Sequence, residues 1–135
     1  MPPALDRIDH VHVFVTDRVK AEPWYREVFN LQRETELEFW ASDGDPLMLK
    51  NPSGTIMLAV FERFPQPSRS TVAFQIGASQ FLEWILHLEQ VTGLKVDVVD
   101  HDVSWSIYFQ DPYDNPYEIT CYEYNALTRE LRQRV

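Results

Sequence analysis

The chain has 135 residues, 44% of them hydrophobic, and a formal net charge of −9. This length and composition fit one globular domain, or two small modules with a shared core, and exclude a disordered protein. An acidic chain needs a concentrated basic patch to bind nucleic acid, and Arg129, Arg132 and Arg134 near the end of the chain are a weak candidate. We therefore expect no nucleic-acid partner.

Cysteine content and hydropathy indicate in which cellular compartment the protein is expected. Cys121 is the single cysteine, so an internal disulfide is impossible. The opening residues MPPALDR lack the apolar core of a signal peptide, and no apolar stretch approaches the length of a membrane span. We expect a cytoplasmic protein without a membrane partner.

The first half of the chain alternates strand and helix patterns. A strand is expected at 10–15, followed by a helix that has Asp17 near its start and Pro23 in its first turn. The apolar stripe of this helix consists of Trp24, Tyr25, Val28 and Phe29. Three strands are expected next, at 34–40, 46–50 and 55–61, with turns at Asp43-Gly44 and Pro52-Ser53-Gly54. Residues 62–70, rich in proline, serine and arginine, are predicted to be a linker.

The second half repeats this order. We expect a strand at 71–76, a helix at 78–92 that Gly93 ends, strands at 95–99, 104–110 and 117–123, and a last helix at 125–134. The apolar stripe of the longer helix consists of Phe81, Trp84, Ile85, Leu88 and Val91, and His87 lies on its exposed side. The prediction is an α+β fold of two βαβββ modules, residues 5–62 and 70–124. They form a curved mixed sheet around a trough, with the helices outside.

The segment FQDPYDNPYEIT, residues 109–120, places a carboxylate within an apolar strand. Alternation puts Glu118, Thr120 and Tyr122 on one face, and Ile119 with Cys121 on the other. A desolvated carboxylate is costly unless water, a cation or hydrogen-bond donors meet it. Glu118 is therefore predicted to have a partner, whereas Cys121 is expected to be an inert buried thiol.

Two stretches resemble the vicinal oxygen chelate superfamily, which includes glyoxalase I, bleomycin-resistance proteins, fosfomycin-resistance transferases and extradiol dioxygenases. IDHVHVFVTD leading into WYREVFNL is similar to the first strand and helix of that family. IYFQDPYDNPYEI is similar to its closing hairpin, F-x-D-P-x-G-N-x-x-E, with Asp114 at the common glycine position. The resemblance covers nearly the whole chain. It implies one glyoxalase-like domain over residues 1–135, a small-molecule ligand, and a homodimer whose pairing completes the troughs.

The resemblance also implies metal ligands. His10 matches the ligand on the first strand and Glu118 the glutamate on the last, whereas Thr71 and Met57 stand where two further ligands would be. These two departures argue against glyoxalase I and the iron extradiol dioxygenases. His12 lies about 6.6 Å further along the strand on the same face as His10. With Glu118 the two histidines would form a two-histidine, one-carboxylate set for one divalent cation, iron, manganese, nickel or zinc. The alternative is that both histidines line a polar trough without metal.

Further residues are expected to line the trough. By resemblance the Tyr108 face of its strand points into the cavity, and neighbouring strands add apolar walls and polar groups. The residues expected to contact the ligand are Phe14, Trp40, Thr71, Gln75, Ser106, Tyr108 and His101. A concave, mostly apolar site with a few polar groups suits a small organic ligand. For each aromatic residue alone, and for His101 as a turn residue, an ordinary structural role is the alternative.

Three functional hypotheses follow. The first is a metal-dependent lyase, isomerase or dioxygenase, in which the cation polarises adjacent oxygens of a small substrate while Glu118, or a water that it orients, moves a proton. The second is a metal-free small-molecule-binding or resistance protein that uses the same aromatic-lined trough. The third is a domain that acts through association with partners. Fold alone does not choose among them.

Overall fold

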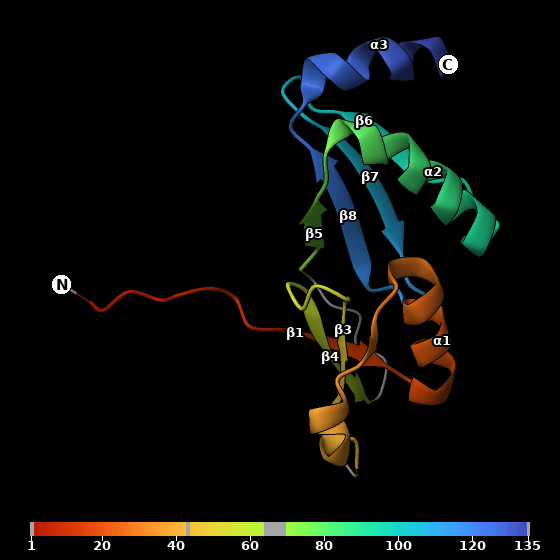
Figure 1. Ribbon diagram of the computed structural model, residues 1–135. Helices are drawn as coiled ribbons and strands as arrows, with labels where there is room; N and C mark the ends of the chain where they lie inside the picture. Colours follow the sequence, from red (N-terminus) through yellow and green to blue (C-terminus); the bar gives the residue numbers. More distant parts are fainter. Residues whose placement is uncertain (1, 43, 64–69, 135) are drawn as a thin grey trace. The chain divides into compact units, whose positions relative to one another are not determined.

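The computed structural model describes residues 2–42, 44–63 and 70–134. The chain divides into two compact units, Met1–Gln66 and Pro67–Val135, and each contains one four-stranded mixed sheet (Figure 1). Among the described helices, none has both the length and the hydropathy needed to cross a membrane.

The first unit has its helix on one face of the sheet. Its elements are β1 (Val11–Val15), α1 (Arg18–Phe29), β2 (Gln32–Arg33), the 3-10 helix η1 (Thr35–Trp40), β3 (Leu47–Lys50) and β4 (Met57–Glu62). The sheet order is β1-β4-β3-β2, with β1 parallel to β4 and the other pairs antiparallel. One face buries the aliphatic residues that alternate along the strands, and α1 contributes Ala21, Tyr25 and Val28 to the same core.

The second unit repeats this topology. Its elements are β5 (Val72–Gln75), α2 (Ala78–Thr92), β6 (Asp97–Asp100), β7 (Trp105–Gln110), β8 (Pro116–Cys121) and α3 (Tyr124–Arg134). The sheet order is β5-β8-β7-β6, again with the first and last strands parallel and the other pairs antiparallel. The predicted α+β fold with a repeated βαβββ order is therefore confirmed.

The strand predicted at 34–40 is wrong. Only Gln32 and Arg33 pair with β3, and residues Thr35–Trp40 form η1. The Glu34 carboxylate accepts a hydrogen bond from the Glu36 amide at 3.3 Å and caps this helix. Glutamate is depleted in strands because it gains little from packing on a pleated surface, so a local cap prevails over the weak strand pattern.

The start of α1 is as predicted, but the position of its proline is not. The Asp17 carboxylate accepts a hydrogen bond from the Lys20 amide at 3.2 Å and is the N-cap. Pro23 is the sixth residue of the helix rather than part of its first turn. It removes a hydrogen bond within the helix, a cost that the burial of the neighbouring Tyr25 and Val28 offsets.

Helix α2 has the predicted bounds. Gly93 ends it with a φ of 71°, as expected for a C-terminal cap. Phe81, Ile85 and Leu88 are buried, but Val91, predicted in the same stripe, is 37% exposed. The prediction that His87 is exposed is also wrong, because its ring lies against the large Trp84 indole, with the ring centroids 5.4 Å apart.

One turn prediction and the linker prediction fall partly outside the described residues. Gly44 and Gly54 have φ values of 82° and 74°, the left-handed conformation that turns require, whereas Asp43 lies outside the described residues. The first two residues of the predicted linker, Glu62 and Arg63, are instead hydrogen-bonded in or beside the first sheet. Glu62 ends β4, and the Arg63 amide donates to the Val15 carbonyl at 2.9 Å. Residues 64–69 lie outside the described residues.

Candidate functional site

Strand β1 brings the two predicted histidines together. Val13 and Val15 face the core beside α1, so His10, His12 and Phe14 face the other way. The Nε2 atoms of the two imidazoles are 3.1 Å apart, and their rings stack with centroids 5.0 Å apart. Asp9 accepts a hydrogen bond from Nδ1 of His10 at 2.8 Å.

The hydrogen bond to Asp9 determines which nitrogen of His10 is available. An ionised carboxylate only accepts, so Nδ1 of His10 carries the proton and Nε2 presents its lone pair. In the metal-free protein His12 then donates its Nε2 proton to His10. Two nitrogens that bind one cation at about 2.0–2.1 Å in tetrahedral geometry lie about 3.3 Å apart. The separation of the pair is therefore close to that of two ligands of one cation, with a carboxylate that orients the first imidazole.

An apolar cluster lies beside His12 on the same face of the first sheet. The buried side chains of Met48, Ala59 and Phe61 pack with the partly buried Phe14, Leu37 and Met57. The parallel register of β1 and β4 sets His12 beside Ala59 and Phe14 beside Phe61. The centroids of the His12 and Phe61 rings are 4.9 Å apart. The predicted role of Phe14 as an apolar wall stays a prediction, but its place in this cluster is clear.

Two residues beside His12, Phe61 and Arg63, were not among the site residues predicted from the sequence. Phe61 lies beneath His12, and the Arg63 guanidinium lies 4.8 Å from the centroid of the Phe61 ring and 5.6 Å from that of Phe14. Alternation along β4 assigns both residues to the Met57 and Ala59 face, so the signal was present in the sequence. The proline, serine and arginine content of residues 62–70 indicates a linker and conceals this alternation at Arg63.

In the second unit, β7 brings a serine to Glu118. Ser106 donates a hydrogen bond from its Oγ to Oε2 of Glu118 at 2.6 Å, and its Oγ is 3.3 Å from that of Thr120. Trp105, by contrast, donates from Nε1 to Thr128 of α3 at 3.0 Å, which places it on the helix-covered face. Glu118 thus has the hydrogen-bond donor that its position in an apolar strand required.

Tyr108 links Glu118 to His101. Tyr108 is directly opposite Glu118 in the β7–β8 register, and its hydroxyl is 2.9 Å from Nε2 of His101. Burial raises the pKa of the Tyr108 phenol, and the negative charge of Glu118 raises it further. His101, Tyr108, Glu118 and Ser106 therefore form one connected polar group in the second unit.

The turn before β8 fixes this strand. Oδ1 of Asp111 accepts from the amides of Tyr113 and Asn115 at 2.8 and 2.9 Å, and Oδ2 accepts from the Asn115 side chain at 2.8 Å. Asp114 has a φ of 65°, the left-handed conformation that aspartate tolerates in a turn. A buried aspartate that accepts three hydrogen bonds makes a rigid turn, which holds β8 in the register that pairs Glu118 with Tyr108.

The remaining predicted residues are more exposed. Gln75 ends β5 and is paired with Thr120, and Thr71 just precedes that strand; both side chains are exposed. Trp40 ends η1, not a strand, and is 39% exposed. It is Leu37 of the same 3-10 helix that joins the apolar cluster. The contacts of Thr71, Gln75 and Trp40 with a ligand stay predictions.

The predicted site residues fall into two groups, one in each unit. His10, His12, Phe14 and Trp40 belong to the first unit. Thr71, Gln75, His101, Ser106, Tyr108 and Glu118 belong to the second. Within the described residues, no three histidine, cysteine or acidic side chains are grouped so as to hold a metal ion. The histidine pair would therefore need a further ligand from elsewhere.

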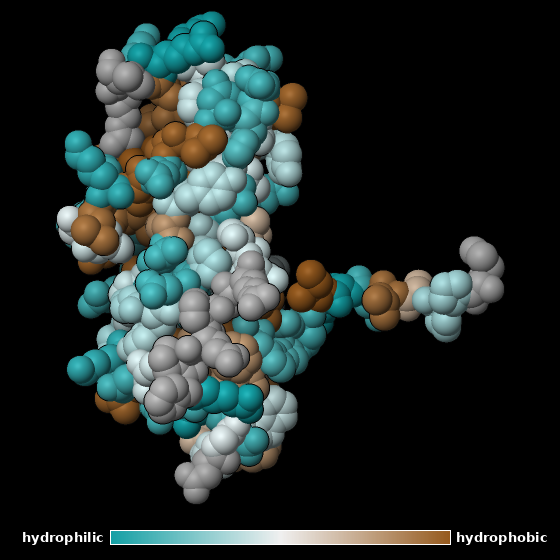
Figure 2. All heavy atoms as spheres, turned by 180° about the vertical axis from the view of Figure 1, so that it is seen from behind, coloured by the Kyte–Doolittle hydropathy of each residue, from teal (hydrophilic) through white to brown (hydrophobic). Residues whose placement is uncertain are grey.

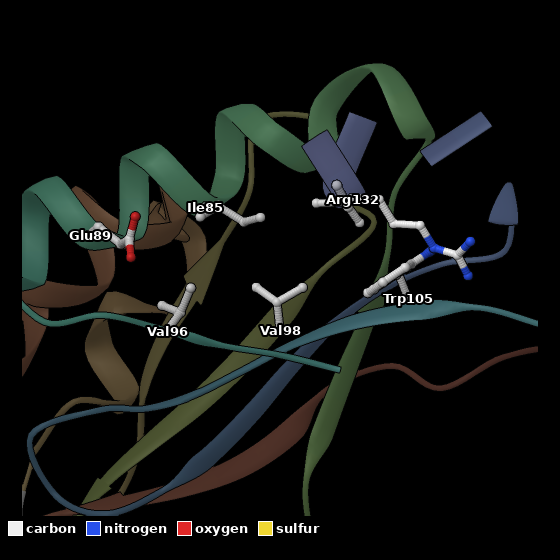
Figure 3. Close-up of a pocket in the computed structure, with 7 residues that line it drawn as sticks. Ile85, Glu89, Val96, Val98, Trp105 and Arg132 are labelled. Carbon is white, nitrogen blue, oxygen red and sulfur yellow. The ribbon is translucent and has the colours of Figure 1, made fainter. Parts of the chain in front are cut away.

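A groove of about 270 Å³ lies on the helix-covered side of the second unit. Its apolar lining includes Ile85 and Val98, and Glu89 and Arg132 lie at its two ends (Figure 3). Figure 2 shows hydrophobic residues in a hollow of this unit. The groove is on the Trp105 side of the sheet, opposite the face that carries Ser106 and Glu118, so it is separate from the polar group of Glu118.

Neither a scan against protein-family models nor a search of curated proteins found a match. Solved structures do resemble the chain. The hexagonal form of FosX, a fosfomycin resistance protein from Listeria monocytogenes, has a TM-score of 0.70 at 17% identity, covering 92% of this chain and 99% of that chain. The Integron Cassette Protein HFX_CASS4, from the mobile metagenome of Halifax Harbour Sewage Outfall, has a TM-score of 0.73 at 20% identity, covering 87% and 99%.

A glyoxalase family protein from Bacillus anthracis has a TM-score of 0.65 at 21% identity, covering 91% of this chain and 100% of that chain. Listeria FosX has also been crystallised with Mn(II) and sulfate and, as a variant, with Mn(II) and 1S,2S-dihydroxypropylphosphonic acid. At these identities the likeness shows the fold. The chain has the fold of these proteins, a glyoxalase-like fold as its sequence resemblance implied.

Proposed function

We propose that this chain binds a small molecule with adjacent oxygens at a divalent cation held by His10, His12 and Glu118. The observation that carries the proposal is the 3.1 Å separation of the two imidazole Nε2 atoms, with Asp9 on the far nitrogen of His10. Listeria FosX, which shares the fold, has been crystallised with Mn(II), and this adds support.

The proposed donor types, imidazole nitrogen and carboxylate oxygen, suit a cation of the iron, manganese, nickel or zinc class. Two imidazoles and one carboxylate leave positions open for a ligand. A cation held there would supply Lewis-acid polarisation of the adjacent oxygens of the ligand. Glu118 belongs to the other unit of the chain, so the proposal requires the two units, of one chain or of two paired chains, to supply one site.

The polar group of the second unit has the chemistry for proton transfer. In this proposal Glu118, or a water molecule that it orients, takes a proton from the ligand. Ser106 donates to the Glu118 carboxylate and holds its orientation, while the Tyr108 hydroxyl is fixed by His101. The reaction is then that of a lyase, isomerase or dioxygenase of the vicinal oxygen chelate type.

A second candidate is a metal-free binding or resistance protein. The apolar cluster of Phe14, Met48, Phe61 and their neighbours favours it, since a mostly apolar surface with a few polar groups suits an organic ligand. In this case the histidines and Glu118 contribute hydrogen bonds, and affinity depends on the aromatic residues.

Metal content measured by elemental mass spectrometry distinguishes the metal-dependent function from the metal-free binding protein. Protein purified without an affinity tag would be compared in the wild type, His10→Ala, Glu118→Gln and, as the control, His87→Ala, whose ring packs on Trp84. The proposal predicts near-stoichiometric metal in the wild type and in His87→Ala, its loss in His10→Ala, and a decrease in Glu118→Gln. Absence of metal in every protein after incubation with manganese, iron, nickel or zinc would refute it and favour the binding protein.

A further inference from the structure

The Arg63 guanidinium lies over two aromatic rings near the histidine pair. Its guanidinium lies over the Phe61 ring at 4.8 Å and over the Phe14 ring at 5.6 Å, while the His12 ring lies 4.9 Å from that of Phe61. Phe61 therefore contacts the cation and an imidazole on the same face of the first sheet. The Arg63 amide bonds to the Val15 carbonyl, which anchors the backbone of Arg63 beside β1.

A cation–π contact does not use the five N–H donors of a guanidinium. These groups match the two oxygens of a carboxylate or a phosphonate. Within the described part of the chain, no carboxylate pairs with Arg63, whereas Arg33 pairs with Glu22 and Lys50 with Glu34.

The net negative charge of the chain opposes the binding of anionic ligands in general. A protein with a net charge of −9 repels anions on average, so an anionic ligand needs a local cation. Arg63 supplies one above an apolar surface, close to the His12 ring. Phe14 and Phe61 would meanwhile contact the apolar part of the same ligand.

We propose that Arg63 selects the ligand of this site: a small organic oxyanion, whose carboxylate or phosphonate binds the guanidinium while its apolar part packs on Phe14 and Phe61. The inference extends the proposed function by naming the ligand class, but it requires no bound metal. The charged group sits at Arg63, and the rest of the molecule extends toward His12.

The test compares benzoate with benzamide, two probes of nearly equal shape of which only the first is charged. Binding to the metal-free protein is followed by NMR titration in the wild type, Arg63→Gln and Arg63→Lys. Arg26→Gln is the matched control, because Arg26 is an exposed arginine of α1 on the other side of the sheet. Phenylphosphonate serves as a tetrahedral probe in the same series.

We expect the wild type and Arg26→Gln to bind benzoate about tenfold more tightly than benzamide, as one charge-assisted hydrogen-bonded pair provides. Arg63→Gln should lose the preference for benzoate while its affinity for benzamide stays the same. Arg63→Lys should keep part of the preference for benzoate, because the charge remains without the planar fork. Equal affinity for the two probes in the wild type, or a preference that survives in Arg63→Gln, overturns the inference. Since the metal is left out, this result is independent of the metal-content experiment.

Discussion

At the scale of single residues, hydrogen bonds determine which atoms of the site are available. Asp9 holds the proton on one side of His10, so the lone pair faces His12. Ser106 directs its hydroxyl at Glu118, and His101 engages the Tyr108 hydroxyl. These groups are oriented before any ligand binds, which lowers the entropic cost of binding.

The tautomer of His10 tests the role of Asp9. In the wild-type protein, at a pH where both imidazoles are neutral, we expect ¹⁵N NMR to show the proton of His10 on Nδ1. Asp9→Ala should shift this population toward Nε2–H, because no acceptor holds the proton, and Asp9→Asn should largely restore it through its amide oxygen. Asp6→Ala, the same change three residues earlier, is the control. An unchanged tautomer in Asp9→Ala would show that Asp9 does not orient the ring.

The Tyr108 phenol provides a test by pH. Its pKa lies above the ordinary value of about 10, so the folded state favours the neutral phenol. This contribution to stability is complete below the unfolded pKa and is lost as the pH rises through the folded pKa. Tyrosinate absorbance, taken as the difference between the wild type and Tyr108→Phe, should show a raised midpoint.

In Glu118→Gln the midpoint of Tyr108 should fall, because the neighbouring negative charge is gone. It should stay above the ordinary value, because burial is the larger cause of the shift. A midpoint that does not respond to Glu118→Gln would mean that the two side chains do not interact.

At the scale of elements, one carboxylate joins the end of β8 to the start of α2. Gly77 is the N-cap of α2 and has no side chain to cap it, and Oε1 of Glu123 accepts from the Ala78 amide at 3.1 Å instead. A Cβ on Gly77 would lie 3.1 Å from the same oxygen, so glycine makes room for this approach. The cap thus comes from a residue far along the chain.

Glu123→Ala should lower the free energy of unfolding by about 1 kcal/mol, the usual cost of losing an N-terminal cap. Glu123→Gln should cost less, because its amide oxygen still accepts the hydrogen bond and only the charge is lost. Urea unfolding followed by circular dichroism measures both, with Glu130→Ala on the exposed side of α3 as the control. Equal losses in Glu123→Ala and Glu130→Ala would argue against the cap.

Elements also mark where sequence reasoning succeeded and failed. The bounds of α2 followed from its apolar periodicity and from Gly93, which are properties of the segment itself. η1 was mistaken for a strand because its aromatic and acidic residues alternate. The competing signal, a carboxylate of Glu34 that caps the next residues, is also local but depends on a backbone geometry that alternation does not reveal.

At the scale of the whole molecule, the proposed site draws on both units. We propose that the protein is a homodimer, since closed two-fold pairing is the commonest assembly of soluble oligomers. His10 and Glu118 of one site then come from one chain or from two. Mixing two variants distinguishes these arrangements, because each variant lacks a different ligand.

His10→Ala and Glu118→Gln chains would be unfolded together, refolded as a mixture and assayed for bound metal. If paired chains share each site, about a quarter of the sites in the mixture regain all ligands, because half of the dimers are mixed and each has one intact site. If each chain holds its own site, the mixture binds no more metal than the average of the two variants. Sedimentation of the wild type should show a dimer in either case, and a monomer would refute the assembly.

The sequence by itself determined the repeated βαβββ order, the cap at Asp17, and the faces on which His10, His12, Ser106, Tyr108 and Glu118 lie. These features depend on periodicity and capping within a few residues. The tertiary structure decided the partners: Ser106 for Glu118, His101 for Tyr108, and Phe61 with Arg63 beside His12. Such contacts depend on the register between strands distant in the chain. Alternation along one strand gives the face of a residue, but not which residue of another strand it meets.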